Sequence, residues 1–138
     1  DNLGLIDIES FIENLPPRKL SEFLQKETDV CLIFQRETEG GKTAIPGKLY
    51  EYLASKKPIF CMDDNGATTE FLTKIGSNLN TDYENIKKIK HLIKTIIKNY
   101  QELKRNYTWD NDFLDDFNRE KQTGKLAEVF GDIIRTTK

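Results

Sequence analysis

The residues best suited to chemistry lie together between positions 46 and 51. Pro46 and Gly47 break the preceding segment, and a glycine lets the backbone come close to a ligand. Lys48 and Glu51 follow in the first turns of a predicted short helix. Free N–H groups at that end of a helix attract an anion such as phosphate. A carboxylate beside them could accept hydrogen bonds from ribose hydroxyls, so the segment predicts a site for a phosphate and a ribose.

Both charged residues also have a plainer interpretation. Glu51 could be an exposed helix glutamate without a ligand, and Lys48 could be a solvated lysine rather than a point charge that faces a diphosphate. The helix itself is supported by apolar positions that recur at helical spacing. These positions are Leu49, Tyr52 and Leu53.

Two polar loops are predicted at one edge of the fold. Residues 35–45 follow an apolar run and carry Gly40, whereas residues 63–66 follow the next apolar run. Ligands of open α/β sheets bind at the carboxyl ends of parallel strands. The residues that this places beside a ligand are Gly41, Asp64, Gly66 and Thr68.

Other interpretations of these loops fit less well. A Walker-type phosphate loop at Gly41 would need a glycine where Arg36 stands. Pro46 would also fall in the first turn of its helix. An acidic pocket of the receiver type at Asp63 and Asp64 would need partners at other strand ends, and none is evident. A turn that lets the next helix begin is the simpler account of the two aspartates.

The central segment also resembles a known family. The run IPGKLYEYLASKKPIF, at residues 45–60, is similar to the nucleotide-binding segment of GT-B glycosyltransferases, particularly the family 4-like bacterial enzymes. The run KLSEFLQKETDVCLIF, at residues 19–34, resembles the helix and strand that precede this segment. The run FNREKQTGKLAEVFGDII, at residues 117–134, resembles the closing helix. Together these runs cover most of the chain from about Ile8 onward.

The resemblance implies the donor-binding, C-terminal half of a retaining enzyme that transfers a sugar from a nucleotide diphosphate sugar to an acceptor. Glu51 then holds the ribose and Lys48 faces the diphosphate, with Gly47, Gly41 and Thr43, together with Asp64, nearby. The family needs no metal or other cofactor. The acceptor and much of the catalytic machinery belong to an N-terminal domain that this chain lacks, so no catalytic residue is assigned here.

The match to the family pattern has one departure. Many members carry a second acid eight residues before the ribose carboxylate, and Thr43 stands at that position. Glu37 and Glu39 lie nearby in the loop. Since the upstream acid often contacts the sugar, the sugar-binding half of the site is less well matched than the ribose half. The family also implies a cytoplasmic location, with many relatives building surface polysaccharides at the inner membrane face.

Composition fits one soluble α/β domain over residues 1–138. The chain is 37% hydrophobic and 32% charged, and its net charge of -2 gives no general attraction to nucleic acid. Basic residues at 87–91 and acidic residues at 110–116 are most simply two solvated helix faces. Cys31 and Cys61 lie in apolar runs and are expected to be buried free thiols. With His91 alone beside them they cannot form a standard zinc site.

The predicted architecture is Rossmann-like, with a mainly parallel sheet and helices on both faces. Strands are expected near residues 6–12, at 30–34 and at 59–62, with a short, poor strand near Leu79. Helices are expected from Pro17, over a short stretch after Gly47 that includes Leu49 and Leu53, and from about Ala67 to Lys74. Closing helices are expected over about 83–136, the last one starting at about Arg119 with Asn118 as its cap.

The two long closing helices are expected to pack inward. A capping box from Thr81 to Glu84 predicts the start of the first one. Its predicted buried face consists of Ile86, Ile89, Ile93, Ile96, Ile97, Tyr100 and Leu103. The predicted stripe of the last helix consists of Leu126, Val129, Phe130, Ile133 and Ile134. Gly124 and Gly131 weaken that helix, so tertiary packing is expected to hold it.

The analogy to the family also leaves a gap in the sheet. The family's first strand in this domain lies at the sheet centre, and by this analogy the chain is expected to start after it. An unfilled central position would leave backbone groups unpaired, which another segment or a second chain would have to satisfy. We therefore expect self-association. The alternative to the glycosyltransferase assignment is a non-catalytic, flavodoxin-like α/β interaction module.

Overall fold

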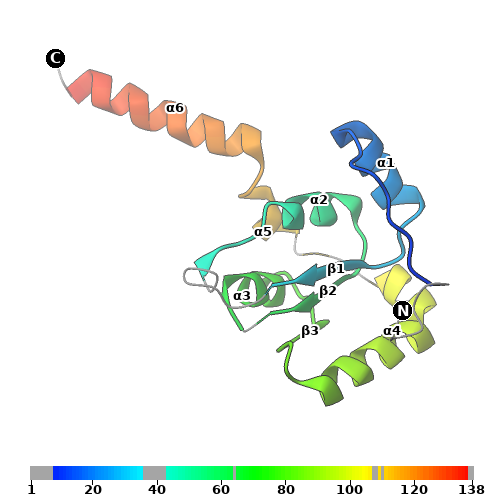
Figure 1. Cartoon of the computed structure of the whole chain (residues 1–138). Helices are drawn as coiled ribbons and strands as arrows, with labels where there is room; N and C mark the ends of the chain where they lie inside the picture. The colour runs from blue at the N-terminus through cyan, green and yellow to red at the C-terminus, as the bar shows by residue number, and fades with distance from the viewer. Residues whose placement is uncertain (1–7, 36–42, 64, 107–108, 110, 137–138) are drawn as a thin grey trace.

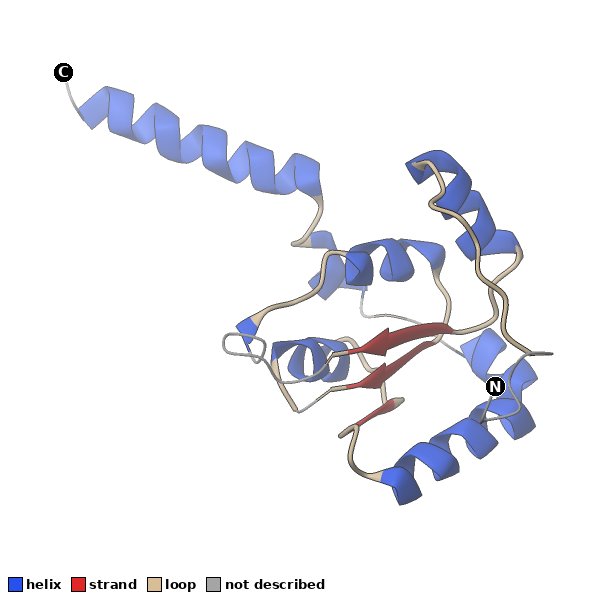
Figure 2. Cartoon of the chain, viewed as in Figure 1, coloured by secondary structure: helices blue, strands red, loops and turns tan. Residues whose placement is uncertain are grey.

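The computed structural model describes residues 8–35, 43–63, 65–106, 109 and 111–136. It is an α/β structure built on a three-stranded parallel sheet in the order β1-β2-β3 (Figures 1 and 2). The strands are β1 (Cys31–Phe34), β2 (Ile59–Met62) and β3 (Asn80–Thr81). Cys31 lies opposite Ile59, and Cys61 lies opposite Asn80. The two longer strands confirm the parallel pairing expected of short, continuously apolar runs.

Three short helices precede or connect the strands, and local sequence features set where they begin or end. They are α1 (Pro17–Lys26), α2 (Lys48–Ser55) and α3 (Ala67–Lys74). Pro17 starts α1 at a position where its missing N–H costs nothing. Lys56 ends α2 in the left-handed conformation with φ 57°, and Gly76 follows α3 with φ 89°.

Most of the core lies between the sheet and these three helices. Ile33, Ile59 and Cys61 are fully buried from the strands, and Leu49 and Leu72 are fully buried from α2 and α3. A second, smaller cluster joins Phe60 of β2 to Leu79 and Leu92. Trp109, which lies between α4 and α5, is also buried in the main cluster.

Three helices complete the chain. They are α4 (Ile86–Asn106), α5 (Asn111–Asp115) and α6 (Arg119–Thr136). The predicted capping box is wrong, because Thr81 pairs in β3 and α4 starts later. Asn85 is the residue that caps α4, accepting a hydrogen bond from the Lys88 N–H at 3.0 Å. Asn118 caps α6 as predicted, accepting one from the Glu120 N–H at 2.9 Å.

The strand predicted at the beginning of the chain is wrong over the residues that the structure describes. Residues 8–16 form no strand, and Phe11 is 95% exposed, with Ile8 and Ile12 also exposed. Ile6 lies outside the described residues. The alternation of apolar residues there is imperfect, and it has no neighbouring strand to pair with.

The predicted burial is wrong for α6 and only partly right for α4. On α4, Ile89 and Ile96 are partly buried against the second cluster, whereas Ile86, Ile93 and Ile97 are exposed. No residue of α6 is buried, and its whole predicted apolar stripe is exposed. Figure 1 shows α6 projecting away from the sheet on the side opposite to α4.

The two cysteines behave as predicted, since Cys31 and Cys61 are both free and buried. Among the described residues, no helix combines the length and the apolar character that crossing a membrane requires.

Candidate functional site

The carboxyl edge of the sheet is organised by a small polar network. Gln35, directly after β1, donates from Nε2 to the carbonyl of Ala44 at 3.1 Å. The buried hydroxyl of Thr68, on α3, donates to Gln35 Oε1 at 3.0 Å and lies 3.4 Å from the same carbonyl. These contacts hold Ala44 in place, and Ala44 leads directly into the start of α2.

The start of α2 leaves one backbone donor open among the described residues. Gly47 precedes the helix in a helical conformation and provides no side-chain cap. The N–H groups of Leu49 and Tyr50 bond back to the carbonyls of Pro46 and Gly47 at 2.9 and 3.2 Å. Within the part of the chain that is described, the N–H of Lys48 has no partner. Open donors at a helix start are the feature that attracts an anion.

Glu51 lies in a cleft beside this helix start. The cleft has a volume of about 570 Å³, and its lining brings α2 together with the start of α6. The lining residues are Gly47, Tyr50, Glu51, Phe117, Arg119 and Gln122. Among the described residues, the carboxylate of Glu51 makes no ion pair and no hydrogen bond, so it remains available to a ligand.

Three lining residues were missed by sequence reasoning. Phe117, Arg119 and Gln122 come from the far end of the chain, and nothing in their local pattern points to Glu51. Asn118, the predicted helix cap, was the available signal that a new element starts here. Sequence reasoning placed that element in the core rather than beside α2.

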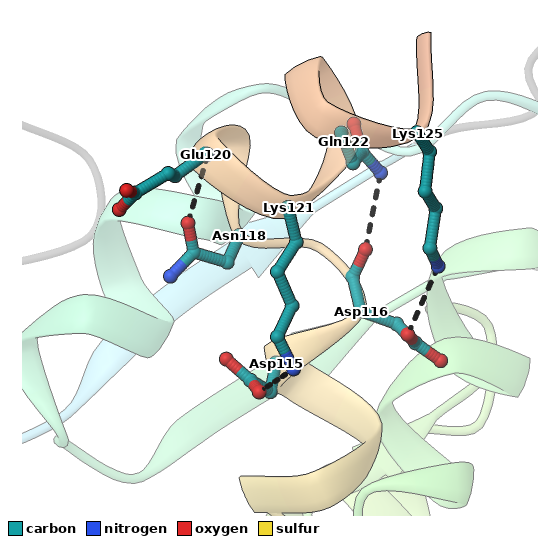
Figure 3. A network of polar contacts seen from close by, with 7 residues as sticks. All are labelled: Asp115, Asp116, Asn118, Glu120, Lys121, Gln122 and Lys125. Carbon is teal, nitrogen blue, oxygen red and sulfur yellow. Dashed lines mark hydrogen bonds and ion pairs between the residues drawn. The ribbon is translucent and has the colours of Figure 1, made fainter. Parts of the chain in front are cut away.

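The start of α6 is held by a polar network with the residues just before it (Figure 3). Lys121 forms an ion pair with Asp115, and this bond raises the pKa of the lysine. Lys125 pairs with Asp116 at 3.2 Å, and Gln122 Nε2 donates to the carbonyl of Asp116 at 3.3 Å. These pairs are exposed and contribute little stability individually, but together they orient the first turns of α6.

Aromatic rings form the inner side of the cleft. The ring centroid of Phe117 lies 5.0 Å from that of Phe71 and 5.3 Å from that of Phe113. The ring of Tyr50 lies 6.2 Å from Phe117 and is exposed in part. Ring pairs at such distances are favourable beyond the area they bury. They connect α5 to α2 and α3, and so place Arg119 near Glu51.

The remaining predicted site residues are dispersed or not described. Lys48 is exposed at the start of α2 but does not line the Glu51 cleft, and Thr43 is exposed one turn upstream. Gly41 and Asp64 lie outside the described residues. Thr68 and Gly66 are buried, so they support the edge of the sheet rather than face a ligand.

Asp63 has a structural role. Its buried carboxylate accepts hydrogen bonds from the N–H groups of Gly66 and Thr69, both at 3.2 Å, and so caps α3. This confirms the turn interpretation of that aspartate. Asp63 also contributes to the environment of Cys61, where burial is the largest effect and the nearby carboxylate the second. Together they raise the pKa of the Cys61 thiol to about 12.

The side chains that line the cleft could each bind a different part of a ligand. Glu51 can accept hydrogen bonds from hydroxyls, the Arg119 guanidinium can bind phosphate in a bidentate manner, and the ring of Tyr50 can stack on a base. Among the described residues, no group of three or more histidine, cysteine or acidic side chains is arranged to hold a metal ion.

The fold and the cleft define an α/β protein with a polar cleft beside the carboxyl edge of a parallel sheet. Comparisons with family models, curated proteins and solved structures found no match to this chain.

Proposed function

We propose that this chain is the donor-binding domain of a glycosyltransferase that moves a sugar from a nucleotide diphosphate sugar to an acceptor. The observation that carries the proposal is Glu51, whose carboxylate opens onto a cleft next to an uncapped helix start. In this proposal the carboxylate accepts hydrogen bonds from the two ribose hydroxyls. A carboxylate can accept two such bonds without any change of protonation.

The other groups of the cleft suit the rest of a nucleotide. The open N–H of Lys48 lies at the start of α2, the helix that carries Glu51, and Arg119 lines the cleft from the start of α6. Both groups favour phosphate oxygens. Lys48 adds a point charge at the same helix end. Tyr50 offers an exposed ring for the base. Gly41, Thr43 and Asp64 remain assigned to the sugar side of the donor by resemblance alone.

At the level of the fold, we propose a Rossmann-like domain with helices on both faces of its sheet, corresponding to the C-terminal half of a GT-B enzyme. The acceptor would bind another domain, and the chain alone would be inactive and would bind the donor weakly. The negative charge of the donor diphosphate would be stabilised by helix starts and basic side chains, without a metal. The whole enzyme would act in the cytoplasm, at the inner membrane face if its product is a surface polysaccharide.

Nucleotide titration with a matched pair of variants tests the proposal. Uridine, guanosine and adenosine diphosphates are added while amide shifts are followed, with the chain, with Glu51→Gln and with Glu70→Gln. Glu70 is also an exposed first-turn glutamate, but on α3. One nucleotide is expected to give saturable shifts around Gly47 and Tyr52. Losing a charged acceptor costs about 1.5–3 kcal/mol, so Glu51→Gln should bind roughly 10- to 100-fold more weakly.

The matched control separates a ribose contact from a general loss of negative charge. Glu70→Gln should bind the nucleotide as the unmodified chain does. Equal affinity of the Glu51→Gln variant, or no response to any of the three nucleotides at millimolar concentration, would refute the assignment.

The second candidate function is a non-catalytic, flavodoxin-like interaction module. The observation that favours it is the amount of apolar surface left open on α4, α6 and the sheet. This candidate predicts a protein partner and no nucleotide response.

A further inference from the structure

A second pocket lies at the end of the sheet opposite to the Glu51 cleft. Its volume is about 440 Å³, and its lining comes from the last turns of α1, α2 and α4 and from the turns that lead into β1 and β2. In Figure 1 this is the end from which the strand arrows start. Among the described residues, none lines both this pocket and the Glu51 cleft, so the two are separate features.

Positive charge predominates in this pocket. Its charged lining residues are three lysines, at 56, 57 and 104, and one acid, Asp29. Within the described part of the chain, none of the three lysines forms an ion pair. The carboxylate of Asp29 accepts a hydrogen bond from the hydroxyl of Tyr100. Ammonium groups that line one pocket repel one another, and a bound anion would relieve that repulsion.

The backbone that carries two of these lysines is held on both sides. Lys56 ends α2 in the left-handed conformation, and its N–H donates to the carbonyl of Leu53 at 3.1 Å. Two residues further on, the carbonyl of Pro58 accepts a hydrogen bond from the N–H of Cys31 at 2.9 Å. Lys57 lies between these two anchors and is partly buried. Both lysines are therefore fixed beside the start of the sheet.

The third lysine is placed by a contact between distant parts of the chain. The hydrogen bond from Tyr100 to Asp29 joins α4 to the turn before β1, across 71 positions of the sequence. Lys104 lies one turn further along α4, with its Nζ 6.0 Å from the centroid of the Tyr100 ring. A ring face at this distance attracts a cation. The Tyr100 contact therefore brings a charge of α4 to the pocket that the lysines of α2 line.

This arrangement suits a compact ligand with several negative charges. A lysine ammonium binds phosphate as a point charge with three N–H donors, and the volume lies in the range of small-molecule sites. We propose that the pocket lined by Lys56, Lys57 and Lys104 binds a phosphorylated ligand that carries more than one negative charge. The site is distinct from the proposed ribose site and does not depend on nucleotide binding at Glu51.

The lysines also have a role that needs no ligand. Basic side chains near the end of a helix interact favourably with its last carbonyl groups, and this applies to Lys56 on α2 and to Lys104 on α4. That effect acts on each helix separately. It does not require the two helices to contribute lysines to one pocket, and it gives no response to phosphate. Dependence on an added anion therefore separates the two roles.

Titration with inorganic pyrophosphate at constant ionic strength, followed by amide shifts, tests the site. Saturable shifts are expected at residues 55–57 and 100–104. Lys57→Gln and Lys104→Gln should each weaken binding by about fivefold or more, because each removes one positive charge from the pocket. Lys98→Gln is the matched control, since Lys98 is also exposed on α4 but does not line the pocket. It should bind pyrophosphate as the unmodified chain does.

Two further variants give results that a general loss of charge would not. Asp29→Asn keeps an oxygen that can accept the Tyr100 hydrogen bond but removes the negative charge, so it should bind pyrophosphate roughly two- to fivefold more tightly. Glu51→Gln should leave pyrophosphate binding at these residues unchanged. The proposed nucleotide site and this pocket can therefore fail independently of each other.

The source of the phosphate is tested with vesicles of phosphatidylcholine, with and without phosphatidic acid. A lipid headgroup predicts sedimentation with the phosphatidic acid vesicles that Lys57→Gln abolishes, in addition to pyrophosphate binding, whereas a soluble ligand predicts pyrophosphate binding alone. The absence of saturable pyrophosphate shifts at residues 55–57 and 100–104 would overturn the proposal. So would equal weakening by Lys98→Gln and Lys57→Gln, which indicates general attraction to a basic surface, or unchanged affinity in both pocket variants.

Discussion

At the scale of single residues, the fold leaves some functional side chains open to a cleft and buries others in the core. Glu51 and Arg119 face a cleft and stay accessible, whereas Cys61 is fully buried. Asp63 is buried too, but its carboxylate is used to cap α3. The open acid is therefore the one suited to a ligand, and the buried acid is the one suited to the structure.

The buried thiol leads to a prediction about pH. Burial raises the pKa of Cys61 to about 12 from its ordinary value of 9.0, so the folded chain keeps a proton that the unfolded chain releases earlier. This contribution to stability is fully present below about pH 9 and is lost as the pH rises toward about 12. The group alone should lower the free energy of unfolding by at most about 1.4 kcal/mol per pH unit in that interval.

Chemical denaturation of the chain and of Cys61→Ala, between about pH 8 and pH 11, measures this contribution. The variant should be less stable at every pH because it leaves a small cavity, but its stability should fall less steeply above about pH 9. Cys31, whose pKa is also raised mainly by burial, is present in both proteins and cancels from the comparison. Equal slopes for the two proteins would contradict the prediction.

At the scale of elements, the strands and short helices were predictable because each carries its own signal. The apolar runs ending at Phe34 and Met62 form the parallel strands, and Pro17 starts a helix where expected. The sequence could not show against which surface each amphipathic helix packs. An apolar stripe predicts that a helix packs, but it does not say against what, and no residue of α6 is buried among those that the structure describes.

Only the part of the candidate site that lies at the start of α2 could be predicted from the sequence. Gly47, Lys48 and Glu51 are neighbours in sequence, and the structure places them at one helix start. Arg119 and Gln122 reach the same cleft through the packing of Phe117 on Phe71, which depends on the tertiary fold. The early strand expected near Ile8 failed for the same reason, because a strand is defined by a partner that its own sequence does not contain.

Replacing Gly124 and Gly76 by alanine should change stability in opposite directions. Gly124 lies inside α6 with open space around it, so Gly124→Ala should stabilise the helix by up to about 1 kcal/mol and slow amide exchange in α6 by about fivefold. Gly76 also has open space, but its φ is 89°. Gly76→Ala should therefore lower the free energy of unfolding by about 1 kcal/mol or more.

Hydrogen exchange for the first variant and chemical denaturation for both provide the readouts. Because α6 buries no residue, Gly124→Ala should leave the global free energy of unfolding unchanged in dilute solution. A large rise in the global free energy of unfolding for Gly124→Ala would contradict the first prediction. An unchanged free energy of unfolding for Gly76→Ala would contradict the second.

At the scale of the whole molecule, the chain divides into a packed body and a projecting helix. Among the described residues, the core clusters draw on α1, β1, α2, β2, α3 and α4 and on residues as late as Phe117, and on none of α6. The ion pairs that join α6 to Asp115 and Asp116 are exposed. The body should therefore be stable without the helix, and the helix should become ordered mainly through what it binds.

A chain that ends at Asn118 tests this division. In dilute solution its free energy of unfolding should lie within about 0.5–1 kcal/mol of that of the full chain, because only exposed ion pairs are lost. Chemical denaturation of both chains in dilute solution gives the comparison. A shortened chain that is unfolded in dilute solution would show that α6 belongs to the body.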